Sequence, residues 1–171
     1  MRRNALNTGF FVSSYEMKHP EEKYHVFSTR EVNLKDLTRN RCVILTLPGA
    51  FTPTCTYQHV PSFEDKYDEI RSYGVNEVYI LTINDFFTQR VWLDAMGVTK
   101  LKAISDMELV FGNNLNNAIY RDELGVRNQR EILVFDNCKV EKRFTEVYES
   151  NIHDPFDKTK VENLLDYLKT L

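Results

Sequence analysis

Hydrophobic residues form two kinds of pattern along this chain. Residues 42–47 (CVILTL) and 77–83 (EVYILTI) are nearly continuous apolar runs, which are typical of strands buried on both faces of a sheet. Between them, apolar side chains recur at intervals of three and four positions, and this spacing predicts an amphipathic helix that ends near Gly74. The stripe consists of Val60, Phe63, Tyr67 and Ile70.

Strand and helix patterns continue to alternate through the rest of the chain. Their order predicts a single α/β domain over residues 1–171, a three-layer sandwich with a mixed central β-sheet. The weakly patterned residues 1–23 are expected to be an N-terminal extension that wraps the surface. Before the first buried run we expect a strand over 24–27 and a helical turn over 34–37. After the second run we expect a helix that Asn84 or Asp85 caps, with the apolar stripe Phe87, Val91, Trp92 and Met96. The remaining expected elements are a strand over 102–105, a helical segment that Asp106 caps, a hairpin over 131–144 and a helix over 161–168.

Composition and charge exclude two classes of partner. The net charge is -3, whereas nucleic-acid-binding proteins usually present a clustered basic surface, so we expect no nucleic-acid partner. No apolar run approaches the roughly 20 residues of a membrane span, so we expect no membrane partner either. The chain has the composition of an ordinary globular protein.

The cysteines indicate a reducing compartment. Cys42, Cys55 and Cys138 show neither CxxC spacing nor Cys/His metal-ligand spacing. An odd set of this kind is a poor disulfide framework, so we expect a cytoplasmic protein without a bound metal. The first residues lack the apolar core of a signal peptide, although Arg2 and Arg3 leave a short organelle presequence as an alternative.

Cys55 stands where α/β sheets usually place their reactive groups. The apolar run 42–47 ends at a Pro-Gly turn, and the helical stripe begins shortly after Cys55, so the thiol is expected at the carboxyl end of a strand and in the first turn of a helix. The free N–H groups and positive dipole end of a helix favour the nucleophilic thiolate. The loop before Cys55 also contains two hydroxyl side chains and two stiffening prolines: Thr52, Thr54, Pro48 and Pro53. Pro61 should kink the helix. A buried structural cysteine in a proline-rich turn would explain the same position.

Residues 48–55 (PGAFTPTC), with His59 after them, resemble the active-site segment of the peroxiredoxins. The family's Pro-x-x-x-Thr-x-x-Cys core matches Pro48, Thr52 and Cys55 without a gap. More narrowly, the segment is similar to the peroxiredoxin-5 subfamily, which includes bacterial peroxiredoxin–glutaredoxin hybrids and one-cysteine antioxidant proteins. The resemblance implies a thioredoxin-like fold, a homodimer and no metal or organic cofactor. Shorter matches follow at residues 83–85, 104–106 and 154–156.

The resemblance also implies an active-site arginine just before a late strand. Arg130 is the match, and its guanidinium would stabilise the Cys55 thiolate and polarise the peroxide. Arg127 is a rival, because many relatives follow this arginine with an aromatic residue where this chain has Glu131. Several relatives also carry Trp before it, where this chain has Gln129.

The implied activity is that of a thiol peroxidase for hydrogen peroxide and organic hydroperoxides. The Cys55 thiolate would attack the terminal peroxide oxygen and become a sulfenic acid, while Thr52, Arg130 and backbone N–H groups stabilise the leaving group. The expected catalytic residues are Pro48, Thr52, Cys55 and Arg130, with Thr52, Thr54 and Arg130 binding the substrate and His59 supporting the loop.

We expect no second cysteine to resolve the sulfenic acid. No cysteine follows Cys138, and position 60 is Val, so the partner positions of two-cysteine relatives are not filled. Cys42 begins a buried strand that rises ~3.3 Å per residue, which places it far from the strand's carboxyl end. Cys138 is expected to be an incidental thiol in a hairpin turn. An external thiol would therefore recycle Cys55: glutathione, glutaredoxin or thioredoxin.

Two other functions use the same cysteine. Cys55 and His59 are four residues apart and would share a helix face, as a nucleophile–base pair of a cysteine hydrolase could. No Asp or Asn that would orient the histidine is evident, which disfavours this hypothesis. The second alternative is a peroxide sensor or thiol-relay protein, and multiple turnovers with glutathione would distinguish an enzyme from such a protein.

Overall fold

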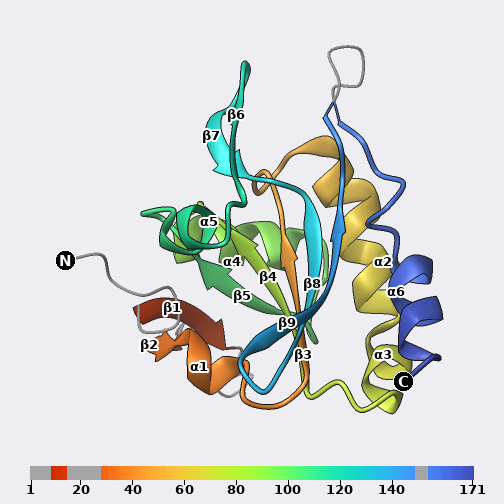
Figure 1. The fold of residues 1–171 in the computed structure, drawn as a ribbon. Coiled ribbons are helices and arrows are strands. Elements are labelled where there is room, and N and C mark those ends of the chain that lie inside the picture. Colours follow the sequence, from red (N-terminus) through yellow and green to blue (C-terminus); the bar gives the residue numbers. More distant parts are fainter. Residues whose placement is uncertain (1–8, 15–27, 149–153) are drawn as a thin grey trace.

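A mixed β-sheet runs through the middle of the molecule in the computed structural model, which describes residues 9–14, 28–148 and 154–171 (Figure 1). Within these residues the sheet has seven strands: β1 (Gly9–Ser14), β2 (Ser28–Asn33), β3 (Cys42–Thr46), β4 (Glu77–Thr82), β5 (Lys102–Ser105), β8 (Glu131–Asp136) and β9 (Lys139–Thr145). Their order across the sheet is β2-β1-β5-β4-β3-β8-β9. The central strands β3, β4 and β5 are parallel, and the others pair with their neighbours in the antiparallel sense.

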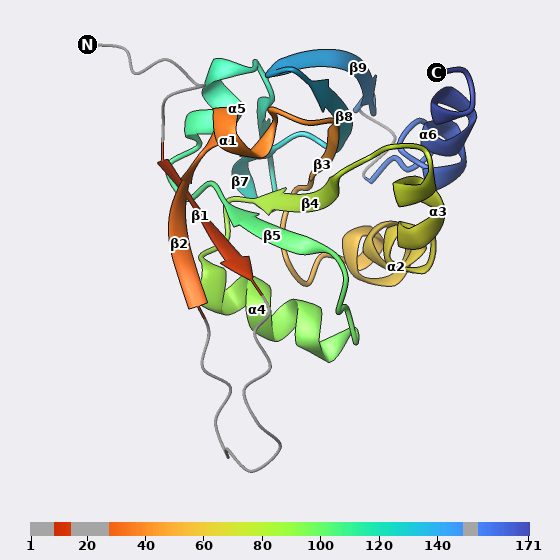
Figure 2. The same ribbon diagram turned by 90° about the horizontal axis from the view of Figure 1, so that it is seen from below.

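Helices cover both faces of this sheet (Figures 1 and 2). One face packs against α2 (Val60–Asp65), α3 (Tyr67–Ser72), α4 (Phe86–Ala95) and α6 (Val161–Leu168), and the other packs against α1 (Leu34–Leu37) and α5 (Val110–Asn114). The first core cluster includes Phe63, Ile70, Trp92 and Leu164 with Val43, Leu45 and Val78, and the second includes Leu37 and Phe111 with Ile44, Leu81 and Leu133. The predicted three-layer sandwich with a mixed sheet is confirmed. Among the described residues, no helix is long and apolar enough to cross a membrane.

The two apolar runs predicted as buried strands are β3 and β4, and both are buried along their whole length. Because the two strands are parallel, their carboxyl ends lie at the same edge of the sheet. The Leu47 N–H extends the pairing there by donating to the Leu81 carbonyl at 2.9 Å. The loops that follow β3 and β4 therefore meet at the edge where open α/β sheets place their functional groups.

The apolar stripe predicted for α4 was wrong. Phe87 and Val91 are each 59% exposed, whereas Trp92 is fully buried. The buried face of the helix is centred on Gln89 instead, whose amide group donates to the Thr82 hydroxyl and to a β5 carbonyl, both at 2.8 Å. These hydrogen bonds offset the cost of burying a polar side chain, which the apolar pattern alone does not reveal.

The N-terminal extension also differs from the prediction where it is described. Gly9–Ser14 does not wrap the surface but forms β1, which pairs with β2 on one side and β5 on the other. This pairing satisfies backbone groups of β5 that would otherwise lie at an open sheet edge. The rest of residues 1–23, and the strand predicted over 24–27, lie outside the described residues.

A second hairpin was not predicted. Strands β6 (Ala118–Arg121) and β7 (Gly125–Asn128) form a separate two-stranded sheet that projects from the top of the molecule in Figure 1. Asn117, at its base, is fully buried, and its amide group donates to the Thr46 hydroxyl at 3.2 Å. The hairpin is thereby fixed at the carboxyl end of β3.

Candidate active site

Hydrogen bonds fix the loop that follows β3. The Ala50 N–H donates to Asn84 Oδ1 at 2.9 Å, which ties the loop to the end of β4. The Thr52 hydroxyl donates to the Gly49 carbonyl at 2.9 Å. Phe51 adopts the left-handed backbone region, with φ 62°, which is strained for a residue with a side chain and persists only where the surroundings impose it. The loop is thus held in one conformation.

Cys55 begins a π-helical turn, η2 (Cys55–His59), and not a regular α-helix. The Val60 N–H reaches back five residues to the Cys55 carbonyl. Pro61 comes next and has no N–H, so it cannot continue the four-residue hydrogen-bond pattern. The kink predicted at Pro61 therefore takes the form of a wider turn that starts at the cysteine.

Thr56 connects this turn to the core. Its hydroxyl donates to the Thr52 carbonyl at 2.7 Å and accepts a hydrogen bond from Trp92 Nε1 at 3.0 Å. Trp92, which belongs to the predicted apolar stripe of α4, lies in the core. The backbone on both sides of Cys55 is therefore anchored to α4.

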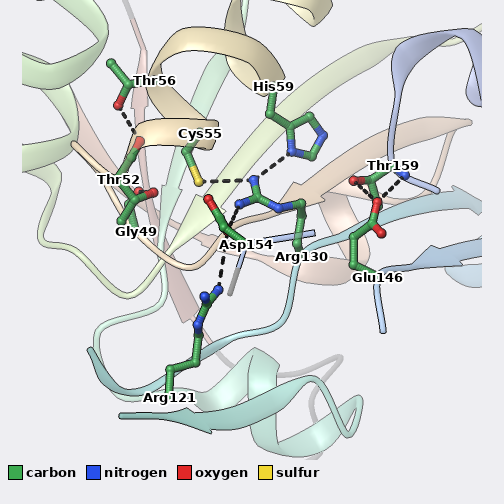
Figure 3. A network of polar contacts seen from close by, with 10 residues as sticks. All are labelled: Gly49, Thr52, Cys55, Thr56, His59, Arg121, Arg130, Glu146, Asp154 and Thr159. Carbon is green, nitrogen blue, oxygen red and sulfur yellow. Dashed lines mark hydrogen bonds and ion pairs between the residues drawn. The ribbon is translucent and has the colours of Figure 1, made fainter. Parts of the chain in front are cut away.

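Arg130 lies beside the sulfur of Cys55. Its Nη1 is 3.3 Å from Cys55 Sγ and 3.3 Å from His59 Nδ1 (Figure 3). All three residues are fully buried. The rival candidate, Arg127, lies on β7 and donates to the carbonyl of its neighbour Val126 at 3.1 Å. The structure therefore brings Arg130 to Cys55 and places Arg127 in the projecting hairpin.

The charge of Arg130 is balanced by a carboxylate. Arg130 Nη2 donates to Asp154 Oδ1 at 2.5 Å, and Arg121 Nη1 lies 3.5 Å from the same oxygen (Figure 3). Burial alone would lower the pKa of Arg130, but the negative charges of Cys55 and Asp154 raise it. The guanidinium is therefore fully charged at neutral pH.

His59 is a neutral ring in this site. Burial, and then the charge of Arg130, hold its pKa well below the usual 6.5. The ring lies against two aromatic side chains, with its centroid 5.3 Å from that of Phe63 and 5.0 Å from that of Phe156. Because Arg130 can only donate, His59 Nδ1 is the acceptor and Nε2 carries the proton. Because this imidazole carries no positive charge, it orients the Arg130 guanidinium without competing with it for the negative charge of a Cys55 thiolate.

A pocket of about 370 Å³ opens next to these residues. It is lined by Pro48, Thr52, Pro53, Thr54, Arg121, Glu123, Leu124 and Asp154. The sequence-predicted Pro48, Thr52 and Thr54 are thus part of its wall. Cys55 follows Thr54 in the chain, and Arg130 is ion-paired with Asp154, so the pocket reaches the immediate neighbours of both. Cys55 itself is fully buried and is not among the lining residues.

The other two cysteines lie at the opposite end of β3. Cys42 is the first residue of that strand, is fully buried, and has its pKa raised to about 12, chiefly by burial and then by the charge of Glu77. Cys138 lies in the β8–β9 turn, where its N–H donates to the Thr38 carbonyl at 2.8 Å. All three cysteines are free thiols.

Sequence reasoning missed several residues of this site. Asn84 was considered as a helix cap and as part of the matched residues 83–85, but Asp85 caps α4 by accepting from the Thr88 N–H, and Asn84 holds the loop before Cys55. Its position directly after a strand parallel to β3 was a usable signal. Asp154 lies in the matched residues 154–156 and Arg121 in no motif, but the sequence placed neither beside Arg130, because their approach depends on the path of two distant segments.

Comparison with known proteins gives relatives over most of the chain. The redoxin family model matches residues 27–165. Peroxiredoxin y4vD of Sinorhizobium fredii is 37% identical over 134 residues, which are 76% of this chain and 71% of that protein. The hybrid peroxiredoxin hyPrx5 of Haemophilus influenzae is 30% identical over 141 residues, covering 81% of this chain and 58% of that protein.

A solved structure agrees with the fold along the whole chain. The Plasmodium falciparum antioxidant protein, a 1-Cys peroxiredoxin, superposes with a TM-score of 0.82 at 27% sequence identity. The match covers 99% of this chain and 100% of that one. The sequence relatives and this structural neighbour therefore point to one family.

Proposed function

This chain belongs to the peroxiredoxin family of thiol peroxidases, as its sequence predicted, and we propose that Cys55 is the thiol that reduces the hydroperoxide. The observation that carries the proposal is the 3.3 Å contact between Cys55 Sγ and Arg130 Nη1 in a fully buried site. A fixed positive charge at that distance favours the thiolate over the thiol. The alternative of an inert core cysteine would not need a buried guanidinium beside the sulfur.

The reaction is a displacement at oxygen. The Cys55 thiolate attacks the terminal oxygen of ROOH, the O–O bond breaks, and the sulfur becomes a sulfenic acid, oxidised by two electrons. The leaving RO⁻ takes up a proton and departs as an alcohol, or as water when the substrate is hydrogen peroxide. Arg130 stabilises the negative charge as it moves from sulfur to oxygen. The Thr52 hydroxyl donates to the Gly49 carbonyl in this structure, so it contributes when it turns to donate to the leaving oxygen instead.

The substrates are proposed to be hydrogen peroxide and organic hydroperoxides. The pocket of about 370 Å³ is far larger than hydrogen peroxide needs, since one water molecule occupies about 30 Å³ of liquid volume. Pro48, Pro53 and Leu124 give it apolar wall area. Such a wall suits the carbon chain of an organic hydroperoxide.

An external thiol is proposed to regenerate Cys55. Cys42 is fully buried at the far end of β3, and Cys138 lies in a turn beside α1, so neither supports an internal disulfide with Cys55. Glutathione, with or without glutaredoxin, and thioredoxin are the candidate reductants. A reducing compartment such as the cytoplasm suits this chemistry, because all three thiols must stay free.

A steady-state assay tests the function. The protein with hydrogen peroxide and glutathione, or with hydrogen peroxide and a thioredoxin system, is expected to give many turnovers. Cys55→Ser should abolish consumption, whereas Cys138→Ser, the matched control, should retain it. Consumption by Cys55→Ser at the wild-type rate would refute the role of Cys55. A single turnover with every reductant would favour the peroxide sensor or thiol relay instead.

A further inference from the structure

We propose that Asp154 is a positioning residue, which orients Arg130 toward Cys55 and offsets part of its charge. The inference rests on the proposed role of Cys55 and extends it to a residue that contacts Arg130 and lines the neighbouring pocket. Its basis is the way one planar guanidinium is shared between two sets of partners.

The two ends of the Arg130 guanidinium have different partners. Nη1 faces Cys55 Sγ and His59 Nδ1, both at 3.3 Å, and Nη2 donates to Asp154 Oδ1 at 2.5 Å. Nε is buried and has no hydrogen-bond partner among the described residues. Because the guanidinium is planar and rigid, the direction of Nη2 fixes the direction of Nη1. The ion pair with Asp154 therefore determines whether Nη1 points at the sulfur.

Asp154 is itself held by several elements. The Thr54 side chain donates a hydrogen bond to its carboxylate, and Arg121 approaches the same oxygen as Arg130. The segment that follows is anchored at Thr159, whose N–H and hydroxyl donate to Glu146 Oε1 at 2.8 and 2.9 Å (Figure 3). The carboxylate therefore joins the cysteine loop, the β6–β7 hairpin, the start of β8 and the C-terminal segment.

The carboxylate is ionised at neutral pH. Burial alone would raise the pKa of Asp154, but the charge of Arg130, the hydrogen bond from Thr54 and the charge of Arg121 together lower it. Its negative charge consequently offsets part of the positive field that Arg130 exerts on the sulfur. Asp154 thus has two separable effects, one through its hydrogen bond and one through its charge.

Two substitutions separate these effects. Asp154→Ala removes both the acceptor and the charge, so Arg130 Nη2 loses its anchor and Nη1 can turn away from the sulfur. Because a displacement of about 1 Å can cost 100-fold in rate, we expect the rate constant for hydrogen peroxide to fall by about 30-fold or more. Asp154→Asn keeps an acceptor but removes the charge, so its rate should stay within about fivefold of wild type.

The pH titration of the thiolate gives a readout that a merely structural residue would not change. In Asp154→Asn the uncompensated charge of Arg130 should move the midpoint of the Cys55 thiolate absorbance to lower pH. The experiment is done in a Cys138→Ser background, and Cys42 stays protonated because its pKa is raised to about 12. The charged and titratable groups that surround the site are His59, Arg121, Glu123, Arg130, Tyr148 and Asp154.

The matched control is Asp157→Ala, whose side chain is 88% exposed and, within the described part of the chain, pairs only with Lys160. It should keep the wild-type rate and titration midpoint. The proposal is overturned if folded Asp154→Ala reacts at the wild-type rate, or if Asp154→Asn leaves the midpoint unchanged. If circular dichroism shows that Asp154→Ala is not folded, the titration midpoint of Asp154→Asn alone tests the proposal. Should Cys55→Ser remain active, the proposed function has failed and not the role of Asp154.

Discussion

At the scale of single residues, one buried guanidinium connects the groups that the proposed reaction needs. Arg130 contacts the sulfur, a neutral histidine and a carboxylate through the two ends of one planar group. A lysine carries the same charge but only one nitrogen, so it cannot serve both ends. The position therefore requires the two terminal nitrogens of a planar guanidinium, and not a positive charge alone.

Arg130→Lys is expected to lower the rate constant for hydrogen peroxide by about 100-fold, the usual loss when one donor to a developing negative charge is removed. Stopped-flow measurement of peroxide reduction checks this. Arg127→Lys on the exposed hairpin is the matched control and should change the rate less than about twofold. A large loss of peroxide rate in Arg127→Lys, together with a small loss in Arg130→Lys, would assign the active-site role to Arg127 instead.

His59 makes the fold sensitive to mild acid. Its pKa is well below 6.5 in the folded chain, so below that pH the unfolded state binds a proton that the folded state excludes. The contribution of His59 to the free energy of unfolding is therefore complete above pH 6.5. Below pH 6.5 the free energy of unfolding decreases by up to about 1.4 kcal/mol for each further pH unit.

His59→Gln should remove this dependence while keeping an acceptor for Arg130. Between about pH 7 and about pH 5.5 the wild type is expected to lose about 1 kcal/mol more unfolding free energy than the variant. Urea titrations at both pH values measure the difference. The other histidines are present in both proteins, so equal losses would mean that His59 is not the group responsible.

The sequence could predict the sulfur, its loop and the arginine, but not the groups that hold the arginine. Cys55 and the residues of its loop are adjacent in the chain, so a local motif contains them. Asp154 lies 24 residues after Arg130, and although residues 154–156 resemble the family, the approach of Asp154 to the guanidinium depends on the whole chain path. The burial of His59 likewise follows from the packing of Phe63 and Phe156 around it.

At the scale of secondary structure, the helix that carries Cys55 departs from regular geometry at the reactive residue. The turn Cys55–His59 is wider than an α-helical turn, and Pro61 follows it. A proline removes the N–H that would otherwise close a regular turn. Wider turns of this kind often occur at functional sites, and here the turn sets the direction of the Cys55 side chain toward Arg130.

Pro61→Ala restores a backbone donor and should allow the turn to shorten toward an α-helix. We expect the free energy of unfolding to change by less than about 1 kcal/mol, because alanine favours helix. The peroxide rate constant should fall by about tenfold, because Sγ moves away from Arg130. Stopped-flow kinetics and urea unfolding test both parts, and an unchanged rate would show that the wider turn does not position the sulfur.

The elements that could be predicted are those whose burial is uniform. β3 and β4 are covered on both faces, so every residue is apolar or sheltered and the pattern is continuous. The β6–β7 hairpin lies outside the main sheet and is only partly covered, so its sequence carries no such pattern. The α4 stripe failed because Gln89 is buried through hydrogen bonds and Phe87 is left exposed.

At the scale of the whole molecule, several large apolar side chains are exposed near the cysteine loop and on α4. Phe51 and Tyr57 flank Cys55 in the sequence and are 56% and 79% exposed, and Phe87 and Val91 lie one turn apart on α4. Exposed apolar groups of this kind are typical of an interface with another protein. The homodimer that the resemblance implies would bury them if the cysteine loop lies near its interface.

Phe87→Glu is expected to shift the protein from dimer to monomer, because a carboxylate would be buried without a partner. Sedimentation velocity measures the change. Val140→Glu on β9, at the far edge of the sheet, is the control and should leave the dimer intact. A wild-type monomer, or a Phe87→Glu dimer of unchanged affinity, would contradict this interface.

The most direct test of the central claim is to find which sulfur receives the peroxide oxygen. The reduced protein is mixed with one equivalent of hydrogen peroxide in the presence of a reagent that traps sulfenic acids, and the modified peptides are identified by mass spectrometry. The account predicts the trapped adduct on Cys55, with Cys42 and Cys138 unmodified. An adduct on Cys42 or Cys138 with Cys55 unmodified would contradict it.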